Sequence, residues 1–182
     1  MHTVYSPAVP GTIPIQEQLR DGCKIRVLGN VTNGHDKTFV IELLSGPHVV
    51  LHISFRFHKE HQIVMNSSSF GNWGPEVRHK NPLHHGNAFD LLISVHSDHY
   101  YISVNGHHLA DYHHRFPAAS AQAVGLRGDV GVSQVIFEGF SFHQDWNRPH
   151  NFGHGGFLGY GTDQYRPPQF QQGHSYNAYW NR

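Results

Sequence analysis

The sequence predicts an all-β protein, a two-sheet antiparallel β-sandwich of the jelly-roll type. From about residue 13 to residue 142, short runs of alternating apolar residues are separated by turn residues, which is typical of strands. No segment carries a long apolar period of 3.6 residues, so we expect at most a short helical turn. Hydrophobic residues make up 38% of the 182 residues, which allows one domain of this size to bury a core.

Two of the expected features are especially clear. Four apolar residues recur at a period of two from Phe89 to Val95, so they share one face of a strand. Asn105-Gly106 separates two further runs, and both residues tolerate the positive φ angles of a tight hairpin turn. The expected strands cover residues 24–29, 38–44, 48–57, 62–66, 75–79, 89–96, 100–105, 107–112, 122–126 and 130–142, the last broken at Gly139.

Two segments flank the expected domain. Residues 1–12 are rich in proline, and we expect them to be extended. Residues 143–182 are rich in Gly, Asn, Gln, His, Tyr and Phe and contain almost no aliphatic side chains. Such a segment cannot bury enough aliphatic surface to offset its ordering entropy, so we expect a disordered tail. Two interpretations stay open: the spaced aromatic residues contact one another, a partner or the sandwich, or the tail is a flexible extension without a dedicated partner.

Charge and cysteine content exclude several classes of protein. Lys+Arg and Asp+Glu number 13 each, so no net field recruits nucleic acid or an anionic membrane. Cys23 is the single cysteine, which excludes an internal disulfide and fits either a reducing compartment or a fold that needs no disulfide. The sequence contains no run of about 18 apolar residues, so we expect no membrane span. The first residues lack the features of a secretory signal. We therefore expect synthesis in the cytosol.

The most informative stretch runs from His52 to Arg78. Between residues 52 and 58, polar and apolar residues alternate, so the polar ones share one face of a strand: His52, Ser54, Arg56 and His58. Glu76 and Arg78 repeat the two-residue spacing, with Trp73 just upstream. An aromatic ring packs on the C–H face of a sugar, and fixed polar groups hold its hydroxyls. The pattern therefore predicts a carbohydrate-binding site.

This stretch resembles the carbohydrate-recognition signature of the galectins. The family pattern is His-x-Asn-Pro-Arg, then Val-x-Asn, then Trp-x-x-Glu-x-Arg. Here it reads His52-Ile53-Ser54-Phe55-Arg56, Val64-Met65-Asn66 and Trp73-Gly74-Pro75-Glu76-Val77-Arg78, and flanking motifs extend the similarity from about Pro10 to Phe142. The resemblance implies a galectin-type carbohydrate-recognition domain over residues 13–142. It further implies metal-independent binding of β-galactosides on glycoproteins or glycolipids.

The resemblance also implies a role for each matched residue. His52 and Arg56 would hold the axial hydroxyl and the ring side of galactose. Asn66 and Glu76 would bind the exocyclic hydroxyl, and Trp73 would stack on the C–H face. Each hydrogen bond contributes only about 1 kcal/mol net, because the sugar gives up water to make it. Affinity for a single sugar should therefore be weak.

Two positions depart from the family pattern. Ser54 stands where the family has asparagine, so one direct hydrogen bond to the axial hydroxyl should be lost or mediated by water. Phe55 replaces a proline, which should free or retilt the strand. We expect weakened or retuned galactoside binding.

Two further residues complete the expected site. Arg78, with Glu76, would reach the next sugar and hold Arg56 in place, and His58 is a candidate extension of the site.

Other functional classes compete with a lectin. The 19 histidines would suit a metal-buffering protein, but adjacent histidines point to opposite faces of a strand and no structural zinc spacing occurs. A glycosidase needs two carboxyl groups flanking the scissile bond. Glu76 is expected to pair with arginines and Glu60 lies in a charged turn, so no matched acid and base emerges. We predict no enzyme activity, no metal and no cofactor.

The expected partners are galactose-containing glycans, without nucleic acid and without membrane insertion. The open alternative is a galectin-like domain whose site has drifted to another glycan, or that binds protein partners through the tail. A homodimer and self-association through the tail also stay open. Galectins commonly leave cells by a route that needs no signal peptide, so the resemblance implies export to the extracellular space.

Overall fold

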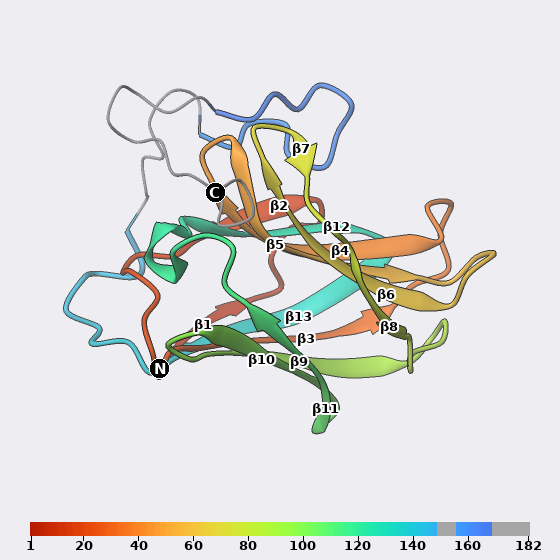
Figure 1. The fold of residues 1–182 in the computed structure, drawn as a ribbon, viewed down its shortest axis with the longest axis horizontal. Coiled ribbons are helices and arrows are strands. Elements are labelled where there is room, and N and C mark those ends of the chain that lie inside the picture. The colour runs from red at the N-terminus through yellow and green to blue at the C-terminus, as the bar shows by residue number, and fades with distance from the viewer. Residues whose placement is uncertain (149–155, 169–182) are drawn as a thin grey trace.

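Two antiparallel sheets packed face to face form the fold (Figure 1). The structure is a computed structural model that describes residues 1–148 and 156–168. Within these residues the one helical element is the short 3-10 turn Ala118–Ser120. The predicted all-β, two-sheet antiparallel sandwich is therefore confirmed.

The two sheets contain six and seven strands. The six-stranded sheet has the order β1 (His2–Tyr5), β13 (Val130–Glu138), β3 (Lys24–Val31), β9 (Ala88–Val95), β10 (His99–Val104) and β11 (His107–His113). The seven-stranded sheet has the order β2 (Gly11–Pro14), β12 (Ala123–Gly128), β4 (Thr38–Ser45), β5 (His48–Arg56), β6 (Gln62–Ser69) and β7 (Asn72–Trp73), and β8 (Val77–Lys80) also pairs with β6.

The Pro-rich N-terminal segment belongs to both sheets. The expected extended segment 1–12 contains two short strands joined by bends: β1 pairs with β13, and β2, which starts at Gly11, pairs with β12. Ile13 is 6% exposed and Val4 packs against the core. Extended backbone at a sheet edge offers its N–H and C=O groups to the neighbouring strand, so two short strands form where proline content alone indicated only an extended segment.

Part of the tail also differs from the sequence expectation. Residues 156–168 form a series of turns, and Phe157 and Tyr160 are only 6% and 5% exposed. They pack with Leu44 and Ala123 on the seven-stranded sheet, so aromatic rings supply the burial that aliphatic side chains do not. Residues 149–155 and 169–182, for which the same disorder was expected, lie outside the described residues.

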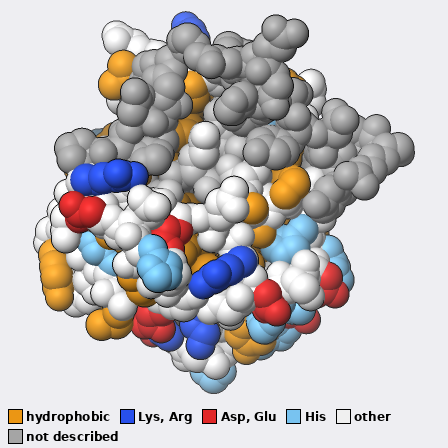
Figure 2. Space-filling view, turned by 90° about the vertical axis from the view of Figure 1, so that its left-hand side faces the viewer, with side chains coloured by type: hydrophobic (Ala, Val, Ile, Leu, Met, Phe, Trp, Pro, Cys, Tyr) orange, Lys and Arg blue, Asp and Glu red, His pale blue; other side chains and the backbone are white. Residues whose placement is uncertain are grey.

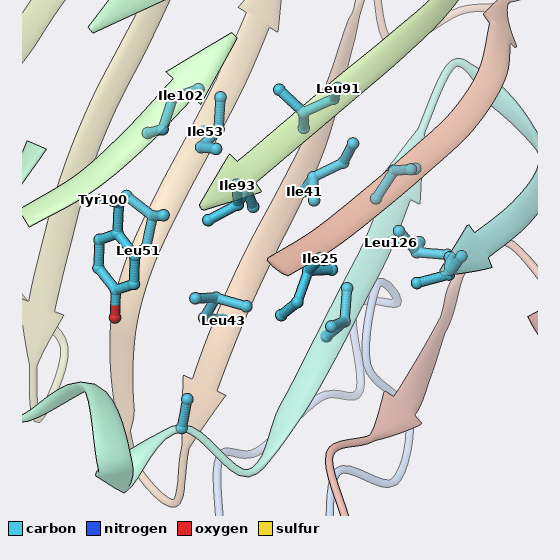
Figure 3. Packing of buried hydrophobic residues seen from close by; sticks show 14 of the residues in the cluster. Ile25, Ile41, Leu43, Leu51, Ile53, Leu91, Ile93, Tyr100, Ile102 and Leu126 are labelled. Carbon is cyan, nitrogen blue, oxygen red and sulfur yellow. The ribbon is translucent and has the colours of Figure 1, made fainter. Parts of the chain in front are cut away.

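The core lies between the sheets and follows the predicted alternation. In β5, Leu51, Ile53 and Phe55 are fully buried and point between the sheets. Figure 3 shows Leu51 and Ile53 facing Ile93, Tyr100 and Ile102 from the opposite sheet. Because successive residues of a strand point to opposite faces, the polar residues of β5 must line the outer surface of the seven-stranded sheet.

The surface carries charges of both signs. Figure 2 shows acidic, basic and histidine side chains interspersed over one face of the molecule. This distribution agrees with the formal net charge of zero with histidines neutral. Among the described residues there is no helix long and apolar enough to cross a membrane.

Candidate functional site

The predicted polar face is formed by β5 and its neighbours. Strand register places Glu42 of β4 opposite His52 of β5, and His52 opposite Asn66 of β6. Two residues further along β5, Ser54 lies opposite Val64 of β6, and Val64 is paired on its other side with Arg78 of β8. The register therefore gathers side chains from four strands on one surface.

A buried carboxylate orients His52. The Nδ1 atom of His52 lies 2.6 Å from Oε2 of Glu42, whose side chain is 3% exposed. Burial by itself raises the pKa of the Glu42 carboxyl, but the hydrogen bonds from His52 and Tyr160 and the charge of Arg127 outweigh burial and lower it. An ionised carboxylate only accepts hydrogen bonds, so Nδ1 carries the proton. In the neutral ring, Nε2 is then an acceptor that a ligand hydroxyl can use.

Tyr160 completes the environment of this carboxylate. Its hydroxyl donates to Oε1 of Glu42 over 2.6 Å, and Nε of Arg127 lies 3.4 Å from the same oxygen. Burial and the neighbouring Glu42 charge raise the pKa of Tyr160, so its hydroxyl stays protonated and remains a donor. The C-terminal segment thus reaches the histidine of the site through one intervening carboxylate.

Glu60 joins the two arginines of the signature. Arg56 donates from Nη1 to Oε1 of Glu60 over 2.6 Å, and Arg78 donates from Nη1 to Oε2 over 2.7 Å. These two hydrogen bonds lower the pKa of Glu60. Arg78 also donates to Glu76, through Nη2 over 3.0 Å. Glu76 and Arg78 were expected to hold Arg56 in place. The structure links Arg78 to Arg56 through Glu60, which accepts hydrogen bonds from both arginines.

Ser54 contacts the signature arginine. Its hydroxyl lies 3.4 Å from Nε of Arg56, and its side chain is almost fully buried, with 4% of the residue exposed. With Ser54 on Nε and Glu60 on Nη1, the Arg56 fork has Nη2 without a hydrogen-bond partner among the described residues. That nitrogen remains available to a ligand.

Asn66 is held in one orientation by the loop that follows β7. Its Nδ2 atom donates to the Gly74 carbonyl over 2.8 Å, and its Oδ1 atom accepts from Arg115 over 2.8 Å. Arg115 donates in addition to the Pro75 carbonyl over 2.7 Å. These contacts connect β6 to the loop that carries Glu76, so the positions of Asn66 and Glu76 are set together.

Trp73 provides the aromatic surface. It is 50% exposed at the edge strand β7, and its ring centroid lies 4.8 Å from that of His52 in an edge-on arrangement. A large exposed ring beside oriented polar groups is suited to packing against the C–H face of a sugar. The tryptophan and histidine thus form adjacent walls of one site.

A hollow of about 460 Å³ brings most of the predicted residues together. Its volume falls within the range of about 300–1,000 Å³ that is usual for small-molecule sites. The lining residues are His52, Arg56, Val64, Asn66, Trp73, Gly74 and Glu76. Five of the predicted site residues are therefore collected in one concave surface.

Three predicted residues lie outside that lining. Ser54 and Arg78 contact arginine and acid residues of the lining and hold them in place. His58 lies in the turn after β5, which ends at Arg56. His58 does not line the hollow, and the next residue, Lys59, has a φ of 64°, in the left-handed region, where the regular alternation of a strand ends.

Comparison with known proteins identifies the family. The sequence profile described as galactoside-binding lectin matches residues 10–137. The chain belongs to the galectin family. This galectin is 54% identical over 180 residues to the probable galaptin lec-8 of Caenorhabditis elegans, covering 99% of this chain and 100% of that protein. It is 41% identical over 150 residues to the probable galaptin lec-7 of the same organism, covering 82% and 84% of the two chains.

Solved structures agree with the sandwich fold of this galectin. Galectin LEC-6 of Caenorhabditis elegans superposes with a TM-score of 0.70 at 29% identity, covering 75% of this chain and 95% of that chain. A variant of human galectin-16 gives a TM-score of 0.67 at 24% identity, covering 75% and 100%, which supports the fold alone. The matched profile ends at residue 137, so the segment 156–168 lies beyond it.

Four supporting residues of this galectin were not assigned to the site by sequence reasoning: Glu42, Glu60, Arg115 and Tyr160. Glu60 alone had a local signal, because it lies four residues after Arg56 in a charged turn. The other three lie on strands or segments distant in sequence. Within the described residues, no group of three or more His, Cys, Asp or Glu side chains is arranged to hold a metal ion.

Proposed function

We propose that this galectin binds β-galactoside-containing glycans in the hollow beside Trp73, without a metal and without catalysis, and with weakened or altered specificity. The observation that carries the proposal is the grouping of an exposed indole with His52, Arg56 and Asn66 around one concave surface. A galactose unit offers both a C–H patch and a rim of hydroxyls, and this surface offers a partner to each.

The polar groups around the hollow divide the work of binding. His52 accepts from the axial hydroxyl through Nε2, since Glu42 holds the proton on Nδ1. Arg56 donates to the same side of the ring, while Asn66 and Glu76 bind the exocyclic hydroxyl. Glu60 accepts a hydrogen bond from Arg56, and Glu76 accepts one from Arg78. Arg56 and Glu76 are therefore oriented before the sugar binds, which reduces the entropy lost on binding.

Ser54 supports the altered specificity. The hydroxyl of this short, nearly buried side chain faces Nε of Arg56 and lacks the reach and the second polar group of an asparagine amide. One direct contact to the sugar is then absent or made through water, and the affinity for a simple galactoside falls. Useful binding at a cell surface would depend on several sites acting together.

The carboxyl groups near the hollow are unsuited to glycoside hydrolysis. A general acid for this reaction needs a raised pKa. Hydrogen bonds from Arg56 and Arg78 instead lower the pKa of Glu60, and Glu76 accepts from Arg78. These ion pairs support binding without bond cleavage.

A glycan array with lactose as competitor tests the proposed function. Wild-type protein is expected to bind galactose-terminated glycans, lactose is expected to displace it, and Trp73→Ala is expected to abolish most of the signal. Tyr5→Ala is the matched control, because Tyr5 is an aromatic residue 72% exposed on the other sheet. Equal binding by Trp73→Ala and wild type would reject the assignment. Binding that survives Arg56→Ala but requires residues 143–182 would favour recognition by the C-terminal segment.

A further inference from the structure

The C-terminal segment 156–168 is fitted to the surface of the seven-stranded sheet. The buried rings of Phe157 and Tyr160 pack against Leu44 and Ala123. Gly125 of β12 makes room for this contact, because a Cβ atom there would lie 2.5 Å from the Tyr160 ring. A side chain at position 125 would displace the tyrosine. The segment is thus seated at a defined place on the sheet (Figure 1).

A second hollow of about 360 Å³ lies between this segment and the sheet. Val49, Trp73 and Arg127 line it from the sheet, and Thr162, Asp163 and Tyr165 line it from the segment. Trp73 also lines the first hollow, so one indole borders both. Glu42 borders the second hollow and holds His52 of the first. The two hollows are therefore neighbours on one surface.

The chemistry of the second hollow matches that of a sugar site. Trp73 and Tyr165 supply aromatic surface, and the Tyr165 ring is held at 5.4 Å from the Tyr160 ring in an edge-on contact. Arg127 supplies donors, Asp163 supplies acceptors, and Thr162 supplies a hydroxyl. The second hollow is lined by two carboxyl groups, those of Glu42 and Asp163, and by one arginine, Arg127. The excess of negative charge disfavours an anionic ligand.

We infer that the second hollow is a subsite that takes a neutral sugar residue of the same glycan whose galactose occupies the first hollow. This inference rests on the proposed galactoside binding and adds to it a specificity that the segment 156–168 supplies. The segment lies outside the matched family profile, which ends at residue 137. A glycan that fills both hollows contacts Trp73 from each of them and also contacts the segment 156–168.

Calorimetry on the full chain separates the two hollows. The probes are lactose and a panel of neutral oligosaccharides that extend lactose by one sugar at different positions. At least one extended glycan is expected to bind about tenfold more tightly than lactose. Tyr165→Ala and Asp163→Ala are expected to remove this gain while the Kd for lactose stays within about twofold of the wild-type value.

Leu158→Ala is the matched control, because Leu158 belongs to the same segment but is 77% exposed and lines neither hollow. This variant should keep both affinities. The inference is overturned if no extended glycan exceeds lactose, or if Asp163→Ala and Tyr165→Ala both retain the gain. A wild-type protein that binds lactose but shows no gain leaves the proposed function intact, whereas failure to bind any galactoside rejects both.

Discussion

At the scale of single residues, the contacts of Arg56 decide how the site differs from the family pattern. Ser54 faces Nε of this arginine over 3.4 Å, and Glu60 binds Nη1 over 2.6 Å. The departure from asparagine was visible in the sequence. The charged turn that holds Glu60 was visible as well, but the hydrogen bond of Glu60 to Arg56 was not, because the direction of the Glu60 side chain depends on the turn between β5 and β6.

Ser54→Asn should strengthen galactoside binding. The amide restores a donor and an acceptor at the rim of the hollow, and one additional hydrogen bond of about 1 kcal/mol corresponds to about fivefold in Kd. Titration of wild type and Ser54→Asn with lactose measures the change. Ser54→Ala serves as the comparison, since it lacks the amide and should not gain affinity. Unchanged or weaker binding by the asparagine variant would show that Ser54 does not limit the affinity.

Tyr160→Phe should lower the free energy of unfolding by about 1–3 kcal/mol, because the buried Glu42 carboxylate loses a donor. The lost bond is the 2.6 Å contact between the Tyr160 hydroxyl and Oε1 of Glu42. Urea unfolding followed by tryptophan fluorescence measures the effect. Tyr5→Phe, which removes an exposed hydroxyl, should change stability by less than about 0.5 kcal/mol. Equal stability of Tyr160→Phe and wild type would contradict the assigned role of this hydroxyl.

At the scale of the element, β5 continues through the position where the family has proline. Phe55 pairs with Phe39 of β4 and Ile63 of β6 and is fully buried. Its ring stacks on that of Phe39 at 4.4 Å between centroids. The loss of proline predicted a freed or retilted strand. Position 55 has a packing role within a continuous ladder.

Phe55→Ala should therefore destabilise the domain by about 3–5 kcal/mol, since a buried aromatic ring leaves a cavity that its neighbours fill only in part. Chemical denaturation of the two proteins gives the difference in free energy. Tyr5→Ala, at an exposed position, should stay within about 0.5 kcal/mol of wild type. A loss below about 1 kcal/mol would show that the core repacks around position 55.

At the scale of the whole molecule, a buried histidine, His48, gives stability a dependence on pH. His48 is 1% exposed, its Nδ1 atom accepts from the Phe70 backbone N–H, and its ring packs beside Phe116. Burial lowers the pKa of His48 to about 4. The unfolded chain binds a proton at this residue near pH 6.5, so between about pH 6.5 and 4 it holds more protons than the folded chain.

Stability should thus be complete above about pH 6.5 and fall as the pH drops toward 4, with His48 contributing a loss of up to about 3 kcal/mol. Urea unfolding at several pH values between about 7.5 and 4.5 tests this. His48→Gln should flatten the dependence, and His107→Gln, at an exposed position, should leave it unchanged. Identical slopes for wild type and His48→Gln would assign the acid sensitivity to other groups.

Local pattern was enough to indicate the sandwich, the polar face of β5 and the residues around Trp73. A period of two directs side chains to alternate faces whatever the rest of the chain does, so His52, Arg56 and the buried Ile53 could be placed from sequence. His58 shows where this reasoning ends. The strand ends at Arg56, and although the next residue, Phe57, still packs against the core, His58 does not line the hollow.

Contacts between distant parts of the chain came only from the tertiary structure. Tyr160 reaches Glu42 across 118 positions and Arg115 reaches Asn66 across 49, and no local period carries such information. The segment 156–168 is poor in aliphatic residues, so composition indicated disorder, yet two aromatic rings find a complementary surface on β4 and β12. Propensity acts through neighbours in sequence, whereas these rings are held by burial and hydrogen bonds that exist only once the sheet has formed.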